Sequence, residues 1–592
     1  MYEPVDEAKL KRLLSSVKRP SRYIGGEWGS GPVKEGSDTV RICYAFPDLY
    51  DVGMSYLGFQ ILYPLTKSLP WADAERVYTP WPDMEAAMRA SGTPIWALES
   101  KRPLKAFDAV GFTLQYELSY TNILTILDLA CIPFRTKDRT EDDPLILAGG
   151  PGALAPEPVA PFIDAFMVGD GEVLIPEVLK ILHELKGRPR AERLAALSEV
   201  EGVYVPSLYK GEKKIRRRIA EKLDERFYHK TMIVPNTGIV HDRVAVQVFK
   251  GCTRGCRFCQ AGIIDRPVRE RSAESVSEQV KTLLDYTGWE EVGLLSLATC
   301  DWSGLSAAFE KFAPMLKDNQ IKLSLPSLRM DAFSVGLAAG LEAMRKGGLT
   351  FAPEAGTQRL RDVINKGVSE EAIETALQET FTHGWEKVKL YFMMGLPTEN
   401  QEDLEGILTI CNRAVAIGRG LKKRGEVNAS VAGFVPKPHT PFQWEPQASI
   451  EKLRETGRWL KNTLRNRKVS LSYHEPEQTF LEGVFARGDS RLAEAVEEAW
   501  KRGARFDGWT EYFNFSRWME VFNDLGIDAA SYTGARATDE KLPWDHIDCG
   551  VTKEYLLRER KKALAAETTQ DCRSGCNGCG WQGRAEVCSD EN

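Results

Sequence analysis

Short apolar runs alternate with longer amphipathic stretches along most of the chain. Between residues 40 and 180, four apolar runs are each followed by a helical pattern: "VRICYAFP", "FDAVGFTLQ", "LILAGG" and "DAFMVGDGE". Strands that alternate with helices in this way form a parallel sheet with helices on both faces. The pattern therefore predicts an α/β, doubly wound domain over residues 1–180.

The alternation starts again at residue 244. Six apolar segments follow, with helical patterns between most of them: "VAVQVF", "EVGLLSL", "IKLSLPS", "GLTFAPE", "KVKLYFMMG" and "VNASVAGFV". The sequence Gly-Trp-Glu enters a strand twice, at 288–290 and 384–386, as repeated βα units would produce. We predict a partial (β/α)6 barrel over residues 241–475. A connector is expected over 181–240, and a small, mainly helical C-terminal region with a Cys-rich tail over 476–592.

The composition is that of an ordinary globular protein, with 592 residues, 43% hydrophobic residues and a formal net charge of −6. We find neither an N-terminal apolar segment nor a run of about 18 apolar residues, so we expect a cytoplasmic protein with no membrane partner. The only dense basic run is "KGEKKIRRR" at 210–218, and we interpret it as a solvated linker rather than a phosphate contact. Nucleic acid is therefore not an indicated partner, although the charge does not exclude it.

Seven of the 12 cysteines fall in two tight groups, and we interpret the other five as core residues. The first group is Cys252, Cys256 and Cys259, in a C-x₃-C-x₂-C pattern directly after a predicted strand. Thiolates at such spacing bind zinc or an iron–sulfur cluster, and zinc would need a fourth ligand. The next 40 residues contain no Cys or His. Three ligands on a four-iron cluster would leave one iron open.

This motif, with Phe258 just before its third cysteine, resembles the signature of the radical S-adenosylmethionine (SAM) enzymes. The resemblance implies a [4Fe–4S] cluster whose open iron chelates SAM, and an electron donor such as flavodoxin or ferredoxin. One electron would cleave SAM to a 5′-deoxyadenosyl radical. In such enzymes the barrel strand ends hold the cofactor. The corresponding SAM-binding candidates are Phe258, Ser296, Ser327, Arg329, Glu354 and Gly395.

We expect Glu354 to pair with the ammonium or ribose of SAM and Arg329 with its carboxylate. Structural ion pairs are the alternative for both. His439 is interpreted as a packed loop residue rather than a general base, so no general acid or base is assigned.

The first domain resembles the Rossmann-like cobalamin-binding domain, whose marks are D-x-H-x-x-G, S-x-L and G-G. Tyr50 stands where that pattern has histidine, so any bound cobalamin would lack a histidine ligand. A purely structural domain is the alternative. The cobalamin-binding candidates are Asp48, Tyr50, Gly53, Ser55, Thr113, Gly149 and Gly150.

The tail repeats the C-x₃-C-x₂-C spacing with Cys572, Cys576 and Cys579, but no strand precedes it. Cys588 could supply a fourth thiolate. We predict a closed iron–sulfur or zinc site with a structural or electron-relay role. The alternative is a tail without metal.

Over nearly its full length the chain resembles a subgroup of cobalamin-domain radical SAM proteins that end in such a tail. The function expected first is cobalamin-dependent methylation of an unactivated carbon in an unidentified substrate. Three alternatives stay open: cobalamin-dependent radical cyclisation or rearrangement, methylation or thiolation of RNA, and a non-catalytic cobalamin or redox sensor.

Overall fold

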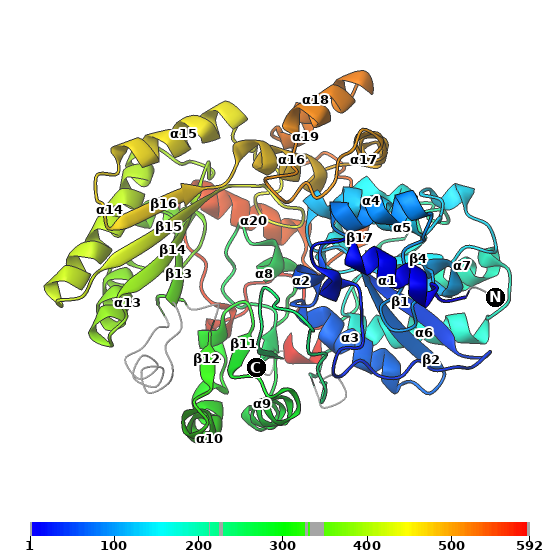
Figure 1. Cartoon of the computed structure of the whole chain (residues 1–592). Coiled ribbons are helices and arrows are strands. Elements are labelled where there is room, and N and C mark those ends of the chain that lie inside the picture. Colours follow the sequence, from blue (N-terminus) through cyan, green and yellow to red (C-terminus); the bar gives the residue numbers. More distant parts are fainter. Residues whose placement is uncertain (1–2, 212, 224–228, 326–328, 332–348, 589–592) are drawn as a thin grey trace.

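The computed structural model describes residues 3–211, 213–223, 229–325, 329–331 and 349–588. Figure 1 shows two α/β parts beside each other, with C-terminal helices above their junction. The predicted fold class is confirmed: a doubly wound domain, a partial barrel and a mainly helical C-terminal region. Within these ranges, no helix combines the length and the hydrophobicity that crossing a bilayer would require.

The N-terminal sheet has six strands in the order β2-β1-β3-β4-β5-β6. All neighbours are parallel except β5 and β6. The strands are β1 (Val40–Phe46), β2 (Ala72–Tyr78), β3 (Ala109–Thr113), β4 (Leu145–Gly149), β5 (Ala165–Met167) and β6 (Val203–Tyr204). Nearly every residue of the central strands is buried, which explains their continuous apolar runs.

Helices cover both faces of this sheet, α4 and α5 on one and α3 and α6 on the other (Figure 1). The helices of this part are α1 (Glu7–Ser15), α2 (Tyr50–Gly53), α3 (Leu57–Ser68), α4 (Pro82–Ser91), α5 (Tyr120–Leu129), α6 (Gly171–Glu184) and α7 (Arg190–Ser198). The segment predicted as a connector begins inside α6 and includes β6, so part of it completes the sheet.

The barrel strands form two parallel sheets, β12-β11-β8 and β13-β14-β15-β16. They are β8 (Val244–Gln247), β11 (Glu291–Leu295), β12 (Lys322–Ser324), β13 (Leu349–Glu354), β14 (Lys387–Met394), β15 (Glu426–Gly433) and β16 (Val469–Tyr473). All six predicted strands are present. The seventh, β16, was not predicted: it is an edge strand, and its sequence "VSLSY" has no continuous apolar run.

Helices α9, α10 and α13 to α15 follow or separate these strands, and a short hairpin of β9 and β10 brackets the first cysteine group. The bounds are β9 (Phe249–Lys250), β10 (Arg269–Glu270), α8 (Gln260–Ile264), α9 (Ala273–Thr287), α10 (Leu305–Asp318), α12 (Gln358–Val363), α13 (Glu370–Thr382), α14 (Gln401–Gly420) and α15 (Ile450–Thr463).

The C-terminal region shares its core with the N-terminal domain. Helix α17 packs against α5, and the Trp500 indole donates to Thr125 Oγ1 at 3.0 Å. Strand β17 (Ile547–Asp548) pairs with β7 (Ile215–Arg216). The helices are α16 (Pro476–Ala486), α17 (Leu492–Lys501), α18 (Phe515–Asp524), α19 (Ala529–Thr533) and α20 (Lys553–Leu564). A helix such as α5, apolar on nearly all sides, needs partners on both sides, and the sheet and α17 provide them.

Candidate functional site

The three cysteines of the first group lie on one loop between β9 and α8. The loop can turn there because Gly251 adopts a φ of 86°, and a Cβ at this position would lie 2.5 Å from the Pro267 carbonyl oxygen. Cys259 then caps α8, and its Sγ accepts a hydrogen bond from the Gly262 N–H at 3.3 Å. All three thiols are half-buried.

The donor chemistry of this loop fits an iron–sulfur cluster. Burial, and then the neighbouring Cys256, raise the pKa of Cys259 to about 12, so the free thiol is neutral and metal binding must drive its deprotonation. A Cβ at Gly262 would lie 3.3 Å from Cys259 Sγ and 3.9 Å from Cys252 Cβ, so a bare glycine keeps that side of the thiols open. In the described part of the chain, no three Cys, His, Asp or Glu side chains are already arranged as ligands of one ion. The fit therefore rests on the shared loop and its donors.

Neighbouring side chains hold the loop from two sides. Phe258 packs into a small apolar cluster at the ends of the barrel strands, with Leu396 and Phe434 among its members. Arg257 is fully buried and forms an ion pair with Glu559 of α20 at 3.1 Å. The loop is thus fixed both to the barrel and to the C-terminal region.

Two of the expected SAM-binding residues are already in ion pairs. Glu354, at the end of β13, accepts a hydrogen bond from Lys366 Nζ at 3.1 Å, and Arg329 pairs with Asp331 at 3.0 Å. The Arg329 guanidinium also donates to the Lys366 carbonyl oxygen at 2.6 Å. Both Arg329 and Lys366 act electrostatically on Cys256. Positive charge therefore lies beside the loop that would carry an anionic cluster.

The other SAM-binding candidates lie at strand ends, as expected. Ser296 follows β11 and lines the large cavity described below. Gly395 follows β14 with a φ of 78°, and its N–H donates to Glu399 at 2.9 Å. Ser327 lies outside the described residues. No sequence pattern indicated Lys366, which reaches the site only because α12 turns the chain back after β13.

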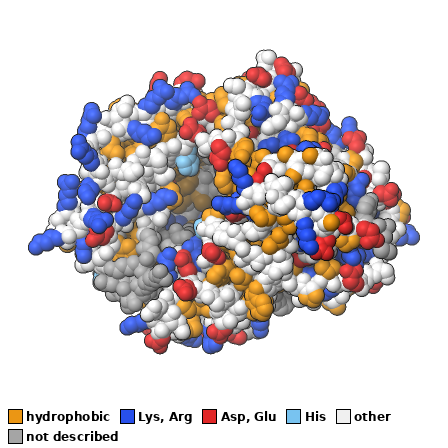
Figure 2. All heavy atoms as spheres, in the orientation of Figure 1, with side chains coloured by type: hydrophobic (Ala, Val, Ile, Leu, Met, Phe, Trp, Pro, Cys, Tyr) orange, Lys and Arg blue, Asp and Glu red, His pale blue; other side chains and the backbone are white. Residues whose placement is uncertain are grey.

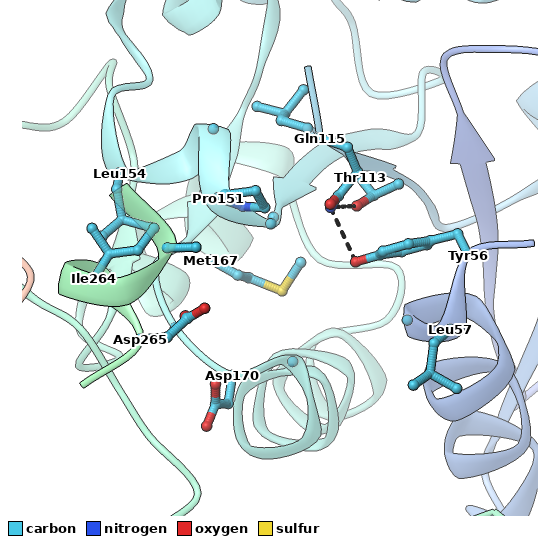
Figure 3. A pocket seen from close by; sticks show the side chains of 18 of the residues that line it. Tyr56, Leu57, Thr113, Gln115, Pro151, Leu154, Met167, Asp170, Ile264 and Asp265 are labelled. Atoms are coloured by element: carbon cyan, nitrogen blue, oxygen red, sulfur yellow. Dashed lines mark hydrogen bonds between the residues drawn. The ribbon is translucent and has the colours of Figure 1, made fainter. Parts of the chain in front are cut away.

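A cavity of about 790 Å³ lies between the N-terminal sheet and the barrel. Thr113, Gly149 and Met167, at the carboxyl ends of three adjacent strands, line one side. In open parallel sheets this edge is where ligands bind. The opposite side comes from the segment just after the cysteine loop, including Ile264 and Asp265, so one cavity joins the sheet edge to that segment (Figure 3).

Several hydrogen-bonding groups line the sheet side of the cavity. In Figure 3, Tyr56, Thr113 and Gln115 lie together, and the Gln115 amide donates to Tyr56 Oη at 3.0 Å and to Thr113 Oγ1 at 2.6 Å. Gly150 has a φ of 91°, and a Cβ there would lie 2.6 Å from the Gln115 amide. Gly149 and Gly150 both line the cavity at this edge, and a glycine at position 150 leaves the space that the Gln115 amide occupies.

Charged residues link the cavity to the cysteine loop. Asp170, in the turn after β5, forms ion pairs with Lys250, Arg269 and Arg217. Its carboxylate lies 3.6 Å from Lys250 Nζ. Lys250 also bonds to Glu172 at 2.5 Å and stands two residues before Cys252. Burial by itself would lower the pKa of Lys250, but the two carboxylates, Asp170 and Glu172, raise it by more. The pKa of Lys250 is therefore above its usual value, and the ammonium group stays charged.

The remaining cobalamin-binding candidates lie away from this cavity. Tyr50 is 1% exposed and its hydroxyl donates to Glu27 at 2.9 Å. Asp48 accepts a bond from the Trp509 indole at 3.0 Å. A Cβ at Gly53 would lie 2.4 Å from the Tyr78 ring, and Ser55 accepts a bond from the His241 N–H at 3.0 Å. These residues therefore pack the turn after β1, whereas Thr113, Gly149 and Gly150 face the cavity.

Comparisons with known proteins agree with this geometry. A family model for the N-terminal part of radical SAM proteins matches residues 58–206, and the model of the radical SAM superfamily matches residues 246–411. An uncharacterised protein of Methanocaldococcus jannaschii is 29% identical over 73% of this chain and 89% of its own length.

Two curated methylthiotransferases match only parts of the chain. The ribosomal protein uS12 methylthiotransferase of Treponema denticola is 22% identical over 30% of this chain and 46% of its own length. The tRNA-2-methylthio-N(6)-dimethylallyladenosine synthase of Aquifex aeolicus is 26% identical over 33% of this chain and 44% of its own length.

Among solved structures, the fold is similar to that of the cobalamin-dependent SAM radical enzyme OxsB, with a TM-score of 0.50 and 13% identity over 89% of this chain and 79% of that one. This likeness extends across both α/β parts. The two family models and the cysteine loop together show that the chain belongs to the radical SAM superfamily, with the N-terminal domain of such proteins before its catalytic barrel.

Proposed function

We propose that this radical SAM enzyme binds cobalamin in the cavity between its two α/β parts and methylates an unactivated carbon of its substrate. The observation that carries the proposal is the position of the cavity. It opens at the carboxyl edge of a doubly wound sheet and ends at the segment that follows the cluster-binding cysteines. A cofactor held there would lie between the sheet and the radical-forming site.

The cavity residues suit a large cofactor with an apolar face and polar substituents. The lining combines apolar side chains such as Met167 and Ile264 with hydrogen-bonding groups such as Gln115. The described lining residues include no histidine, and Tyr50 is buried behind the sheet edge. A cobalamin bound here would therefore have no histidine or Tyr50 ligand on cobalt. The similar OxsB structure has aqua-cobalamin and SAM bound together, which supports the same pairing here.

When bound, the [4Fe–4S] cluster supplies the electron that cleaves SAM to a 5′-deoxyadenosyl radical, and cobalamin supplies a methyl group. Cys252, Cys256 and Cys259 would hold the cluster, with Arg329 and Lys366 offsetting its negative charge. Across the cavity, Lys437 bonds to Glu117 at 2.6 Å and to Glu482 at 2.8 Å. These two ion pairs, which are half-buried, fix the wall of the cavity.

The test uses a variant that fills the cavity without straining the backbone. Gly149 has no close neighbour on its free side, since a Cβ would lie 3.7 Å from the nearest atom. Gly149→Leu should lose bound corrinoid, measured by absorption after purification with added cobalamin. It should retain reductive SAM cleavage, measured as 5′-deoxyadenosine after anaerobic reconstitution. Gly420→Leu, at an exposed position of α14, is the matched control and should keep both. Equal corrinoid in both variants would contradict the proposed binding site.

The methylthiotransferase relatives favour a second candidate, insertion of a methylthio group into a ribosomal protein or tRNA. On the face shown in Figure 2, Lys and Arg side chains predominate along the left edge, over the barrel, and the two signs are mixed elsewhere. A protein that binds no corrinoid but forms 5′-deoxyadenosine with tRNA or ribosomes would favour this candidate over methylation.

A further inference from the structure

The C-terminal tail returns to the catalytic cysteine loop, more than 300 residues earlier in the chain. The Cys572 N–H donates to the Thr253 carbonyl oxygen at 3.2 Å, and Thr253 Oγ1 donates to Asp571 at 2.7 Å. Asp571 also forms an ion pair with Arg254 at 3.2 Å. Thr253 and Arg254 lie between Cys252 and Cys256, so the two cysteine groups are docked on each other.

The four tail cysteines lie on a short segment that folds back on itself. Gly578 adopts a φ of 61°, which lets its N–H donate to Cys576 Sγ at 3.4 Å. Cys576 Sγ in turn donates to Gln582 at 3.4 Å, and the Gly583 N–H reaches the Cys588 carbonyl oxygen at 3.4 Å. These contacts bring the end of the tail back to its beginning.

The fold holds this segment in place at its base. The Thr552 N–H donates to the Cys579 carbonyl oxygen at 2.9 Å, and Trp581, 5% exposed, packs into the large core shared with the N-terminal domain. Cys572 and Cys576 are exposed, whereas Cys579 and Cys588 are half-buried against that core. An anchored segment that carries four cysteines, two of them exposed, suits metal ligands better than core positions.

Arg266 lies between the two cysteine groups. It is 4% exposed, and its guanidinium donates to the Tyr555 hydroxyl at 3.0 Å. It acts electrostatically on Cys572 and Cys579, and on the other side a Cβ at Gly255 would lie 3.1 Å from its Nη2. A buried cation here would stabilise anionic metal–thiolate groups on both sides.

We propose that Cys572, Cys576, Cys579 and Cys588 bind a second metal centre through four thiolates, either an iron–sulfur cluster or zinc, and that this centre holds the catalytic cysteine loop in position through Asp571. The site is independent of whether the protein binds cobalamin. Four thiolates leave no open coordination position, so the role is positional rather than substrate-binding.

The first experiment separates the two sites by removing the catalytic one. The full-length chain with Cys252, Cys256 and Cys259 all changed to Ala is reconstituted anaerobically, once with Fe²⁺ and sulfide and once with Zn²⁺. We expect it to retain either iron with sulfide or about one zinc per chain, and the two arms identify the metal. Adding Cys576→Ser and Cys579→Ser should remove that metal, whereas adding Cys131→Ser, an exposed cysteine elsewhere, should not. Equal metal content in all three chains, with circular dichroism showing that they are folded, would overturn the proposal.

The second experiment tests the positional role with the tail ligands intact. Asp571→Asn removes the carboxylate that bonds to Thr253 and Arg254. The catalytic cluster should then lose iron to a chelator about tenfold faster, the effect of losing one charge-assisted contact. Its reduced-state electron paramagnetic resonance signal should also broaden. Asp539→Asn, an exposed carboxylate outside the contact, is the control. Unchanged iron loss and an unchanged signal in Asp571→Asn would refute the positional role.

Discussion

Asp170 lines the cavity and is joined by an ion pair to Lys250, two residues before the cysteine loop. Its carboxylate is 9% exposed and faces Lys250, Arg269 and Arg217, and it also accepts the Ala220 N–H at 2.8 Å. Asp170→Asn keeps the size of the side chain but leaves these buried cations with one carboxylate fewer. Breaking a buried ion pair by removing one partner costs about 3–5 kcal/mol. The unfolding equilibrium constant should therefore rise by a factor of about a hundred to several thousand.

The assay is denaturant unfolding followed by tryptophan fluorescence at neutral pH, repeated at decreasing pH. Burial would raise the pKa of Asp170, but Lys250, Arg269 and Arg217 hold it well below its usual range. When the pKa of a carboxyl group is lower in the folded than in the unfolded protein, the group stabilises the fold fully at pH values above its unfolded pKa, here about 3.9. This stabilisation is lost as the pH falls through the folded-state pKa. The difference between wild type and Asp170→Asn should therefore be full at neutral pH and shrink below about pH 4.

The control is Asp142→Asn, at an exposed position of the same domain, which should change stability by less than about 0.5 kcal/mol. If Asp170→Asn is as stable as this control at neutral pH, the ion-pair cluster does not stabilise the junction and the reasoning is wrong.

Three further substitutions test other parts of the structure. Gly251→Ala should unfold far more easily than Gly288→Ala and lose its iron on purification. The reason is that a Cβ at position 251 would lie 2.5 Å from a carbonyl oxygen, whereas nothing lies within 4 Å of a Cβ at position 288. Similar iron contents in the two variants would refute this prediction. Burial, and then Glu99, raise the pKa of Glu75 to about 7, so its contribution to stability is full below the unfolded pKa of about 4.3 and is lost as the pH rises through 7. As the pH rises from 5 to 8, the free energy of unfolding should therefore fall less for Glu75→Gln than for wild type. Parallel pH profiles of the two proteins would contradict this prediction. Tyr50→Phe should cost about 1–3 kcal/mol of stability and leave the absorption spectrum of any bound corrinoid unchanged, whereas a shifted spectrum would place Tyr50 at the cobalt.

Local patterns predicted the strands well because buried parallel strands need continuous apolar runs. All six predicted barrel strands are present, and β16 was missed because an edge strand with Ser470 and Ser472 lacks such a run. The cysteine loop was predicted for a similar reason. Ligands that share one loop are set by their spacing, and Cys252, Cys256 and Cys259 lie between β9 and α8.

Of the residues predicted to bind cobalamin, the structure brings only some to the cavity. Residues at the ends of β3 and β4, Thr113 and Gly149, do line the cavity, because parallel strands bring their carboxyl ends to one edge. Tyr50 and Ser55 follow β1 in the same motif but pack into the turn, since a short helix directs their side chains away from the edge. A motif in sequence gives the order of residues but not the direction of each side chain.

By itself, the sequence determined the two α/β parts, the strand ends and the two groups of cysteines, because each depends on contacts within a few tens of residues. Only the tertiary structure decided that the tail docks on the catalytic loop and that Asp170 and Lys250 connect the N-terminal domain to it. These contacts join segments 80 to more than 300 residues apart. They arise from the fit of surfaces that form only when both α/β parts and the C-terminal helices have packed, and no local pattern of hydrophobic and polar residues encodes that fit.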